Sequence, residues 1–382
     1  MGVTANKPGV CTTVQDAGRF GYLGSGFSPS GVMDRRAFRI ANLLVDNPEN
    51  APVLEFCLAG PTLRFTAPTF IALTGGDFGA TIDGAPVPLY TALQVRRGSV
   101  LALNASRTGV YGYLAVAGGS FKIDPVMGST STNLKCRIGG WHGRKLEAGD
   151  YLPFATPAID YLPNLASHAV EDANAFYEFN ADTVRLRVVP GPQEDLFTEE
   201  GIETFYGSPF TVTGKCDRMG FRLDGEVVRT RHGSDIVSDG IALGAVQVPN
   251  HGRPIIMLAD RQTTGGYAKI GTVATVDIPK LVQSRPGRTI RFERISVQES
   301  QALLRDDEVR MRALAKMVKR PCFGGLSPRK TARRLTPILE AQAIAAEHEK
   351  LWVETGDHLH AERIPEIMER RERAKQAPAR TD

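Results

Sequence analysis

The segment "PIIMLADRQTTGGYAKIGTVATVDI", residues 254–278, places a polar, glycine-bearing stretch between two runs that favour β-strand. The flanking runs "PIIMLA" and "TVATVDI" are short, apolar and rich in β-branched residues, as strands are. We interpret "DRQTTGGYAKIG" as a connection between two strands of one sheet. Glycine can adopt positive φ and lets a ligand approach the backbone, so Gly265 and Gly266 predict exposed N–H groups that could surround an oxyanion or a carboxylate.

Similar apolar runs recur on both sides of a less regular region. Residues 1–155 contain "VLEFC", "TLRF", "TFIALT", "VLAL" and "VYGYLAV", and residues 183–297 contain "VRLRVV", "FTVT", "AVQV" and "TIRF". Short strands at this spacing, separated by Gly, Pro and Asp, indicate antiparallel barrels or sandwiches. The sequence therefore predicts a mainly β fold with two units in tandem, joined by a proline-bearing, acidic linker over residues 156–182.

Two regions carry helix signals. In "MDRRAFRIANLLVDNP", Asp34 can cap a helix that Pro48 ends, and we expect its apolar face to close one end of a barrel. Residues 298–382 are charged and rich in alanine, with candidate helices "ESQALLRDDEVRMRALAKMVKR" and "TPILEAQAIAAEHEKLW", the second capped by Thr336. We expect a charged helical tail, either solvated or acting as a docking arm for a partner.

Length and charge restrict the class of protein. A chain of 382 residues suits two domains and a further short element. No stretch of about 20 apolar residues could cross a bilayer, and the N-terminus lacks a signal-peptide pattern, so we expect a cytoplasmic protein without a membrane partner. Residues 299–382 hold 17 of the 46 basic and 14 of the 42 acidic residues. The remaining body is nearly neutral, which argues against a nucleic-acid partner.

Cofactor motifs of standard type are missing from the sequence. The 5 cysteines are scattered and form no CxxC, so we expect reduced thiols and neither a disulfide framework nor a zinc site. His358 and His360 form an HxH pair that we interpret as tail residues and not as metal ligands. The sequence has no P-loop, GxSxG or HExxH motif. "LAKMVK" around Lys316 lies in a helical segment, so we expect no covalently bound biotin on this chain.

Polar clusters lie where loops would meet strand ends. Asp260 could orient a substrate N–H or act as a base, and the hydroxyls of Thr263 and Thr264 are adaptable donors. A purely structural hairpin would explain the same residues. Arg218 and Arg222, if they share one side of a strand, would favour a carboxylate, carbamate or phosphate, although surface charge is a competing explanation.

A second polar cluster, "TTVQDAGRFGYLGSGFSPSGVMDRR", precedes the first helix. A loop of this kind beside a helix N-terminus suits an anion or a carbonyl oxygen. An Asp16–Arg19 ion pair that braces a turn is the structural alternative.

Four motifs follow one another along the chain: "TTVQDAGRFGYLGSGFSPSGVMDRRAFRIANLLVDN", "ALTGGDFGATIDGAPVP", "DRMGFRLDG" and "GAVQVPNHGRPIIMLADRQTTGGYAKIGTV". Together they resemble the allophanate hydrolase subunit 2 family, also described as subdomains A and B of a biotin-dependent carboxyltransferase. The family includes the Kip antagonist and the C subunit of bacterial 5-oxoprolinase. The resemblance extends over residues 3–296 and implies two tandem cyclophilin-like β-barrel domains, with the tail outside them.

The resemblance also implies roles for individual positions. Implied catalytic residues are Asp260, Thr263 and Thr264. Implied substrate-binding residues are Asp16, Arg19, Ser30, Asp34, Arg218, Arg222, Asp239, Gln247, Gln262, Gly265, Gly266 and Tyr267. The chain departs from the family's pattern at Thr130 and Asn133, where Arg and an aromatic residue are usual, and at Cys216 and Ala268.

Three functions are compatible with this resemblance. The first is a subunit of an ATP-dependent amide or lactam hydrolase of the 5-oxoprolinase or allophanate hydrolase type, whose cleft is completed by a subunit 1 partner, a Kip inhibitor-like protein. ATP would then be used by the complex, together with a further hydrolase subunit. The second is a biotin-dependent carboxyltransferase subunit acting on a urea-like substrate, with biotin carried by a partner and a biotin carboxylase subunit. The third is a non-catalytic regulator of a kinase inhibitor.

Overall fold

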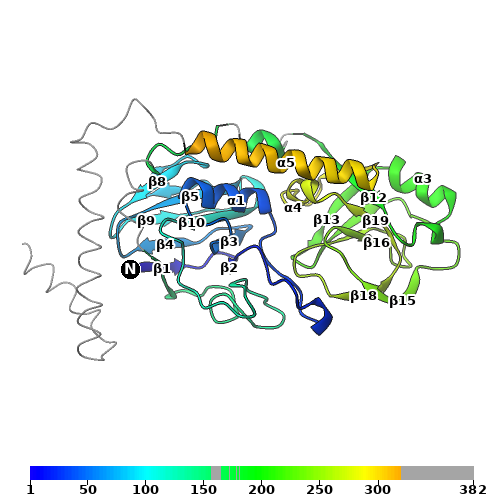
Figure 1. Cartoon of the computed structure of the whole chain (residues 1–382), viewed down its shortest axis with the longest axis horizontal. Coiled ribbons are helices and arrows are strands. Elements are labelled where there is room, and N and C mark those ends of the chain that lie inside the picture. Colours follow the sequence, from blue (N-terminus) through cyan, green and yellow to red (C-terminus); the bar gives the residue numbers. More distant parts are fainter. Residues whose placement is uncertain (156–164, 172, 178, 180, 320–382) are drawn as a thin grey trace, which may run out of the picture.

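A computed structural model of the chain describes residues 1–155, 165–171, 173–177, 179 and 181–319, and the fold is mainly β (Figure 1). The first unit has two antiparallel sheets. The larger sheet contains, in order, β11 (Tyr151–Pro153), β1 (Gly2–Lys7), β4 (Thr62–Phe65), β9 (Val100–Ala102), β6 (Thr81–Ile82) and β7 (Ala85–Pro86). The smaller contains β2 (Cys11–Gln15), β3 (Val53–Cys57), β10 (Thr108–Val116), β5 (Thr69–Asp77) and β8 (Ala92–Val95).

The two sheets of the first unit pack face to face around one apolar core. Val3, Leu63 and Leu101 from the six-stranded sheet meet Leu54 and Leu114 from the five-stranded sheet, and all five are fully buried. Hydrogen bonds between the described strands do not join the two sheets into a ring. The first unit is therefore a pair of packed sheets, which is the sandwich alternative of the strand pattern, and the closed barrel implied by the resemblance is not found in it.

Helix α1 (Arg35–Leu44) begins as predicted and covers a sheet face. The Ala37 N–H donates to the Asp34 carboxylate at 2.9 Å, which is the expected N-cap. The buried face of α1 packs against β5 and β10, and the Thr74 hydroxyl on β5 donates to the Ala37 carbonyl at 2.8 Å. The helix thus covers the outer face of the five-stranded sheet, and the expectation that it closes the end of a barrel is wrong.

The second unit is a closed barrel, as predicted. Its strands are, in order around the ring, β12 (Thr183–Pro190), β19 (Lys269–Val273), β16 (Ala245–Gln247), β17 (Ile255–Met257), β14 (Gly220–Gly225), β13 (Phe210–Cys216) and β20 (Thr289–Arg294). The β12–β20 pair is parallel. Closure of the ring leaves no free edge among these strands. A separate two-stranded ribbon, β15 (Asp235–Gly240) with β18 (Thr264–Tyr267), projects from the barrel (Figure 1).

Short helices complete both units. They are η1 (Leu23–Ser25), η3 (Ala173–Tyr177), η4 (Glu194–Leu196), α3 (Glu199–Gly207), η5 (Thr275–Asp277) and α4 (Ile278–Val282). The described part of the predicted linker packs on the first unit, since Leu165 and His168 are buried and the His168 ring contacts the Leu44 carbonyl at 2.9 Å. This part of the linker is therefore built into the fold.

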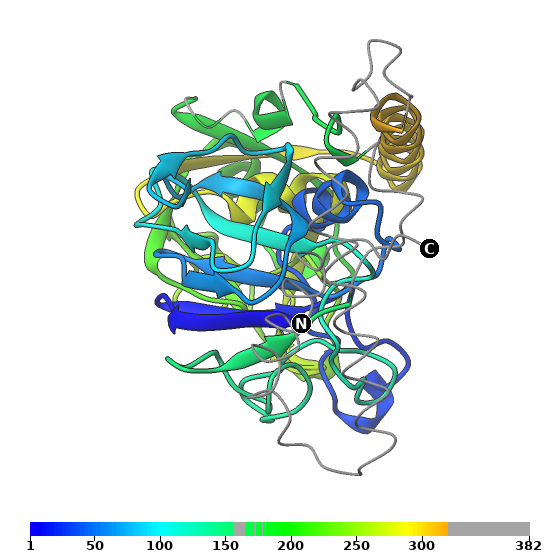
Figure 2. The ribbon, with the colours of Figure 1, turned by 90° about the vertical axis from the view of Figure 1, so that its left-hand side faces the viewer.

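Helix α5 (Val297–Val318) begins at a capping box formed by Ser296 and Glu299 and runs along both units (Figure 1). Turned by 90°, Figure 2 shows it beside α1 on the outside of the molecule. Arg36 pairs with Asp307 at 2.9 Å, and Arg39 holds both oxygens of Glu308 at 2.7 and 2.9 Å.

The first helix predicted in the tail therefore exists, and it docks on the chain's own first unit. No described helix is long and apolar enough to span a membrane. The second tail helix, Cys322, His358 and His360 lie outside the described residues.

Candidate functional site

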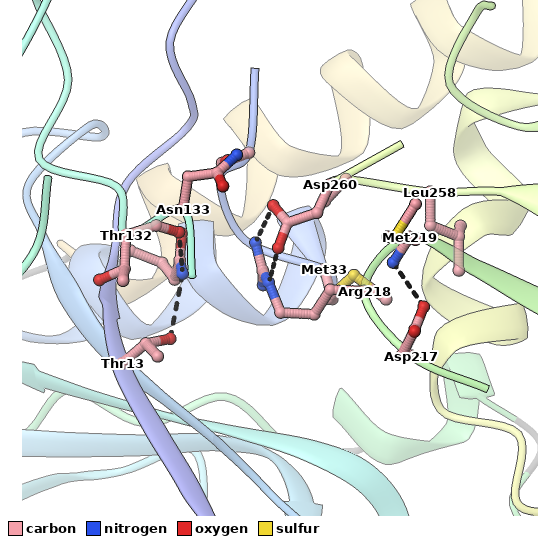
Figure 3. Close-up of polar contacts among 12 residues, drawn as sticks. Thr13, Met33, Thr132, Asn133, Asp217, Arg218, Met219, Leu258 and Asp260 are labelled. Carbon is pink, nitrogen blue, oxygen red and sulfur yellow. Dashed lines mark hydrogen bonds and ion pairs between the residues drawn. The ribbon is translucent and has the colours of Figure 1, made fainter. Parts of the chain in front are cut away.

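Arg218 joins the two units through a buried ion network. It lies just before β14, and its guanidinium holds both oxygens of Asp260, at 2.8 and 3.1 Å. Its remaining N–H groups reach Glu55 on β3 of the first unit and the Gly31 carbonyl, the latter at 2.6 Å. Figure 3 shows the two parallel contacts between Arg218 and Asp260. The predicted catalytic carboxylate is thus fully engaged by an arginine at the junction.

The side chains of this network are almost completely buried. The side chains of Arg218, Asp260 and Glu55 are only 10%, 11% and 3% exposed. Burial disfavours the charge of Arg218, but Asp260 and Glu55 outweigh it and hold the pKa of the guanidinium well above its ordinary value. Glu55 is also satisfied by the Met33 N–H at 2.7 Å and the Tyr113 hydroxyl at 2.9 Å. Sequence inspection missed Glu55, which stands in an apolar strand motif.

Asp16 and Arg19 lie in the loop before α1 but do not form an ion pair. Asp16 accepts hydrogen bonds from Gly18 and from residues 129–131, at distances between 2.5 and 3.1 Å. The guanidinium of Arg19 donates to the Val126 and Ser131 carbonyls, and its Nη1 is buried without a partner among the described residues. Burial lowers the pKa of Arg19. Arg19 is therefore a buried guanidinium whose Nη1 has no acceptor among the described residues.

Thr130 and Asn133, the two residues at which the chain was expected to depart from the pattern it resembles, contact predicted site residues. The Thr130 N–H and hydroxyl both donate to Asp16, at 2.7 and 3.1 Å. The Asn133 amide donates to the Ser30 hydroxyl at 3.0 Å, and Ser30 has a positive φ of 54°. Asn133 lies near the Arg218–Asp260 pair in Figure 3. The unusual residues at 130 and 133 thus help to shape this loop.

Most of the TTGG segment, residues 263–266, lies in a strand that begins at Thr264. Thr264–Tyr267 form β18, in which Gly265 faces Asp239 and Thr264 faces Gly240 on β15. Neither Gly265 nor Gly266 has a positive φ, so the conformational freedom that glycine allows is not used at these two positions. The segment does connect barrel strands β17 and β19, as expected. Thr264, Gln262 and Tyr267 are exposed, and Thr263 is partly exposed.

A polar group lies where the ribbon meets the barrel. The buried Lys269 ammonium pairs with Asp239 at 2.9 Å. Gln247 is 3% exposed, and its Nε2 has no hydrogen-bond partner among the described residues. A Cβ at Gly265 would lie only 2.8 Å from this nitrogen. A side chain at 265 would therefore force the end of the Gln247 side chain to shift.

The side chains of two other predicted residues, Asp34 and Arg222, do not contact Arg218 or Asp260. Asp34 is buried and is held by the Ala37 N–H and by the Gln283 amide at 2.9 Å, and burial raises the pKa of its carboxyl group. Arg222 is exposed on the barrel, whereas Arg218 turns into the junction. The two arginines therefore do not share a site.

A cavity of about 140 Å³ opens between the units, beneath α5. Of the predicted site residues, only Ser30 lines it. Arg261 also lines it and was missed, although it follows Asp260 directly in the motif. No group of three or more His, Cys, Asp or Glu side chains in the described part of the chain could hold a metal ion.

Comparison with known proteins identifies the family. The profile of the carboxyltransferase domain, subdomain A and B, matches residues 25–294. The chain belongs to this family. Among its members, the C subunit of the Escherichia coli 5-oxoprolinase is 37% identical over 302 residues, which cover 79% of this chain and 94% of the relative.

Larger members of the carboxyltransferase family contain a similar region. Urea amidolyase of Saccharomyces cerevisiae is 32% identical over 324 residues, 80% of this chain but 17% of that protein. The crystal structure of the Kluyveromyces lactis urea amidolyase matches with a TM-score of 0.74 and 29% identity, over 86% of this chain and 20% of that one. The region found as a subunit in one relative is thus part of a much longer chain in others.

Proposed function

We propose that this chain is the C-type subunit of an ATP-dependent 5-oxoprolinase, a hydrolase of the cyclic amide bond. The observation that carries the proposal is the 37% identity to the E. coli subunit over 94% of that protein's length. Identity to the urea amidolyase is lower, at 32%. ATP would be used by the complex, and no cofactor is assigned to this chain.

The proposed active cleft runs along the junction between the two units. Its walls would be the loop that carries Arg19 and Ser30, the Arg218–Asp260 pair, and the ribbon that carries Thr263 and Thr264. Two buried donors that have no partner among the described residues, Arg19 Nη1 and Gln247 Nε2, support this assignment. An unpaired buried donor costs about 1–3 kcal/mol, and a substrate carbonyl or carboxylate oxygen would remove that cost.

Within this cleft we assign Asp260 to positioning. Both of its oxygens are held by Arg218, so proton abstraction by Asp260 would require that ion pair to open. Thr263 and Thr264, on the exposed ribbon, would donate hydrogen bonds to the developing oxyanion. Removing a single donor of that kind costs roughly 10²-fold or more in rate.

The ribbon is also the proposed contact for subunit 1, the Kip inhibitor-like partner. Val237 on β15 is 91% exposed and Tyr267 on β18 is 40% exposed. An apolar side chain so exposed on a narrow ribbon suits a partner that covers it. In the complex, the partner would close the cleft from the ribbon side.

The test is reconstitution with the partner subunits. The complex should convert 5-oxo-L-proline to glutamate with ATP hydrolysis, and avidin should have no effect. Conversion of urea that avidin blocks would instead establish the second candidate, a biotin-dependent carboxyltransferase, which the similarity to urea amidolyase favours. No turnover of 5-oxoproline, urea or allophanate, with binding to a kinase inhibitor, would favour a regulator and reject both enzymes.

A further inference from the structure

The cavity beneath α5 is built from both units and from the helix itself. The loop before α1 contributes Ser30 and Met33, and the turn after β17 contributes Leu258 and Arg261. Helix α5 closes the cavity with Leu304, Asp307, Glu308 and Met311. The Ser28 hydroxyl, two residues before Ser30, donates to the Ala259 carbonyl at 3.0 Å, so the two walls are fixed to each other.

The cavity wall carries an excess of positive charge. Four arginines and two carboxylates line it: Arg35, Arg36, Arg39, Arg261, Asp307 and Glu308. Both carboxylates form ion pairs with arginines of the wall, Asp307 with Arg36 and Glu308 with Arg39. Arg261 has no carboxylate within ion-pair distance in the described part of the chain. Its Nε donates to the Ile241 carbonyl at 2.9 Å and its Nη1 to the Leu258 carbonyl at 3.3 Å.

A buried guanidinium without a counter-charge is unusual. Arg261 is only 7% exposed, and its burial lowers its pKa with no carboxylate to oppose the effect. Buried charges are normally paired because desolvation costs several kcal/mol per ion. The observation therefore points to an anion that is supplied from outside the chain.

The rest of the wall limits the size and nature of that anion. Val32, Met33, Leu258, Ile278 and Met311 are apolar and buried. One water needs roughly 10–15 Å³ of such space, so about 140 Å³ accommodates a ligand of roughly ten non-hydrogen atoms. A small ring that bears one carboxylate fits both the charge and the apolar surface.

We propose that this cavity is the carboxylate subsite for the cyclic amide substrate, and that Arg261 selects ring acids over neutral lactams. The assignment of the ligand as substrate rests on the proposed function. Arg261 is one residue from Asp260, and Ser30 lines the cavity, so the subsite adjoins the proposed cleft. A purely structural Arg261 would only tie the Ile241 and Leu258 carbonyls together.

The first experiment measures binding to the complete chain by calorimetry. The wild type should bind 5-oxo-L-proline roughly 10- to 100-fold more tightly than 2-pyrrolidinone, its analogue without the carboxylate, because a charge-assisted contact is worth about that factor. Arg261→Gln should reduce the preference to less than about threefold. The matched control Arg185→Gln removes an exposed arginine of β12 and should leave the preference unchanged. Equal binding of both compounds by the wild type, or an unchanged preference in Arg261→Gln, would overturn the proposal.

A second probe separates this proposal from the reaction. Cyclopentanecarboxylate has the ring and the carboxylate but no amide bond, so its binding does not depend on hydrolysis. If it binds in an Arg261-dependent manner while the reconstituted complex leaves 5-oxoproline intact, the carboxylate site stands and the proposed function fails. If 5-oxoproline is hydrolysed with the same KM by wild type and Arg261→Gln, the function stands and the subsite fails.

Folding of the variant is controlled in two ways. Circular dichroism reports whether Arg261→Gln is folded. If the variant is unfolded, the proposal is tested on the wild type by phenylglyoxal modification of Arg261, measured by peptide mass spectrometry. Cyclopentanecarboxylate should slow this modification, and 2-pyrrolidinone should not. Equal modification with both compounds would reject the site.

Discussion

Charged residues that a motif marks as substrate ligands can instead hold the protein together. Arg218 and Asp260 occupy motif positions, yet each is mainly engaged by the other and, through Glu55, by the first unit. The sequence was sufficient to select Arg218 and Asp260 as motif residues. It did not predict that Glu55 pairs with Arg218, because Glu55 lies 163 positions away and no local pattern links the two residues.

The first prediction concerns this ion pair. Asp260→Asn should lower the free energy of unfolding by about 1–3 kcal/mol, since it leaves Arg218 buried with only one carboxylate. Urea denaturation measures the change. The control is Asp224→Asn, which breaks the exposed Asp224–Arg253 pair and should leave stability nearly unchanged. Equal stability of Asp260→Asn and wild type would show that the network does not stabilise the junction.

A second prediction concerns pH. Cys11 on β2 lies directly opposite Cys57 on β3, and the interaction with the Cys57 thiol lowers the pKa of Cys11 to about 7. Because the thiolate is the reactive form, alkylation of Cys11 by iodoacetamide should rise with pH and reach half its maximum near pH 7. Mass spectrometry of the Cys11 peptide follows the rate.

The Cys57→Ala variant supplies the control for this measurement. Without the Cys57 thiol, the midpoint for Cys11 should move up toward the value of about 8.5 for an ordinary thiol. A midpoint that is the same in both proteins would mean that Cys57 does not stabilise the Cys11 thiolate.

At the level of elements, local signals were reliable where local interactions decide. The Asp34 cap was predicted from nearby residues and agrees with the structure. The helix predicted from Glu299 onward exists as α5, although its start at Val297 and its capping box were not predicted. The TTGG segment was expected as a connection between strands, and its two glycines allow positive φ without requiring it. The sequence did not show that most of this connection is itself a strand. Pairing with β15, about 25 positions earlier, decides its conformation instead, and single-segment propensity does not report such pairing.

The third prediction compares neighbouring glycines of β18. A Cβ at Gly265 would lie 2.6 Å from the Ile241 side chain and 2.8 Å from Gln247, whereas at Gly266 the nearest atom is 3.4 Å away. Gly265→Ala should therefore destabilise the protein by about 1–3 kcal/mol through overpacking. Gly266→Ala should stay close to wild type. Thermal unfolding of both variants is the measurement, and equal midpoints would argue against close packing of the ribbon on Gln247.

At the scale of the whole molecule, sequence patterns predicted two β-rich units but not how each is closed. Runs such as "VLEFC" and "TIRF" are compatible with packed sheets and with a barrel. Closure depends on which distant strands pair, as β12 does with β20 more than 100 positions later. The contact between the units through Gln283 could not be predicted from the sequence either. Nothing in the sequence distinguishes Gln283 from an ordinary polar residue that follows a short helix.

The fourth prediction concerns that joint. Gln283 Oε1 accepts from the Val110 and Tyr111 N–H groups, and its Nε2 donates to Asp34 and to the Tyr111 carbonyl. Gln283→Ala should lower the free energy of unfolding by about 3 kcal/mol or more, since several buried groups lose their partner. Gln301→Ala, on the exposed side of α5, is the control. A Gln283→Ala protein as stable as this control would exclude Gln283 as a main tie between the units.

The return of α5 to the first unit has a consequence for biosynthesis. Arg36 and Arg39 are translated early, but Asp307 and Glu308 follow 271 and 269 positions later. At a ribosomal rate of roughly 5–20 residues per second, that interval is on the order of ten seconds to a minute. During this time Arg36 lacks the carboxylate that pairs with it in the folded chain, whereas Arg39 can already pair with Glu49, ten positions later. Arg36 of the nascent chain is therefore open to chaperones and to neighbouring polysomal chains.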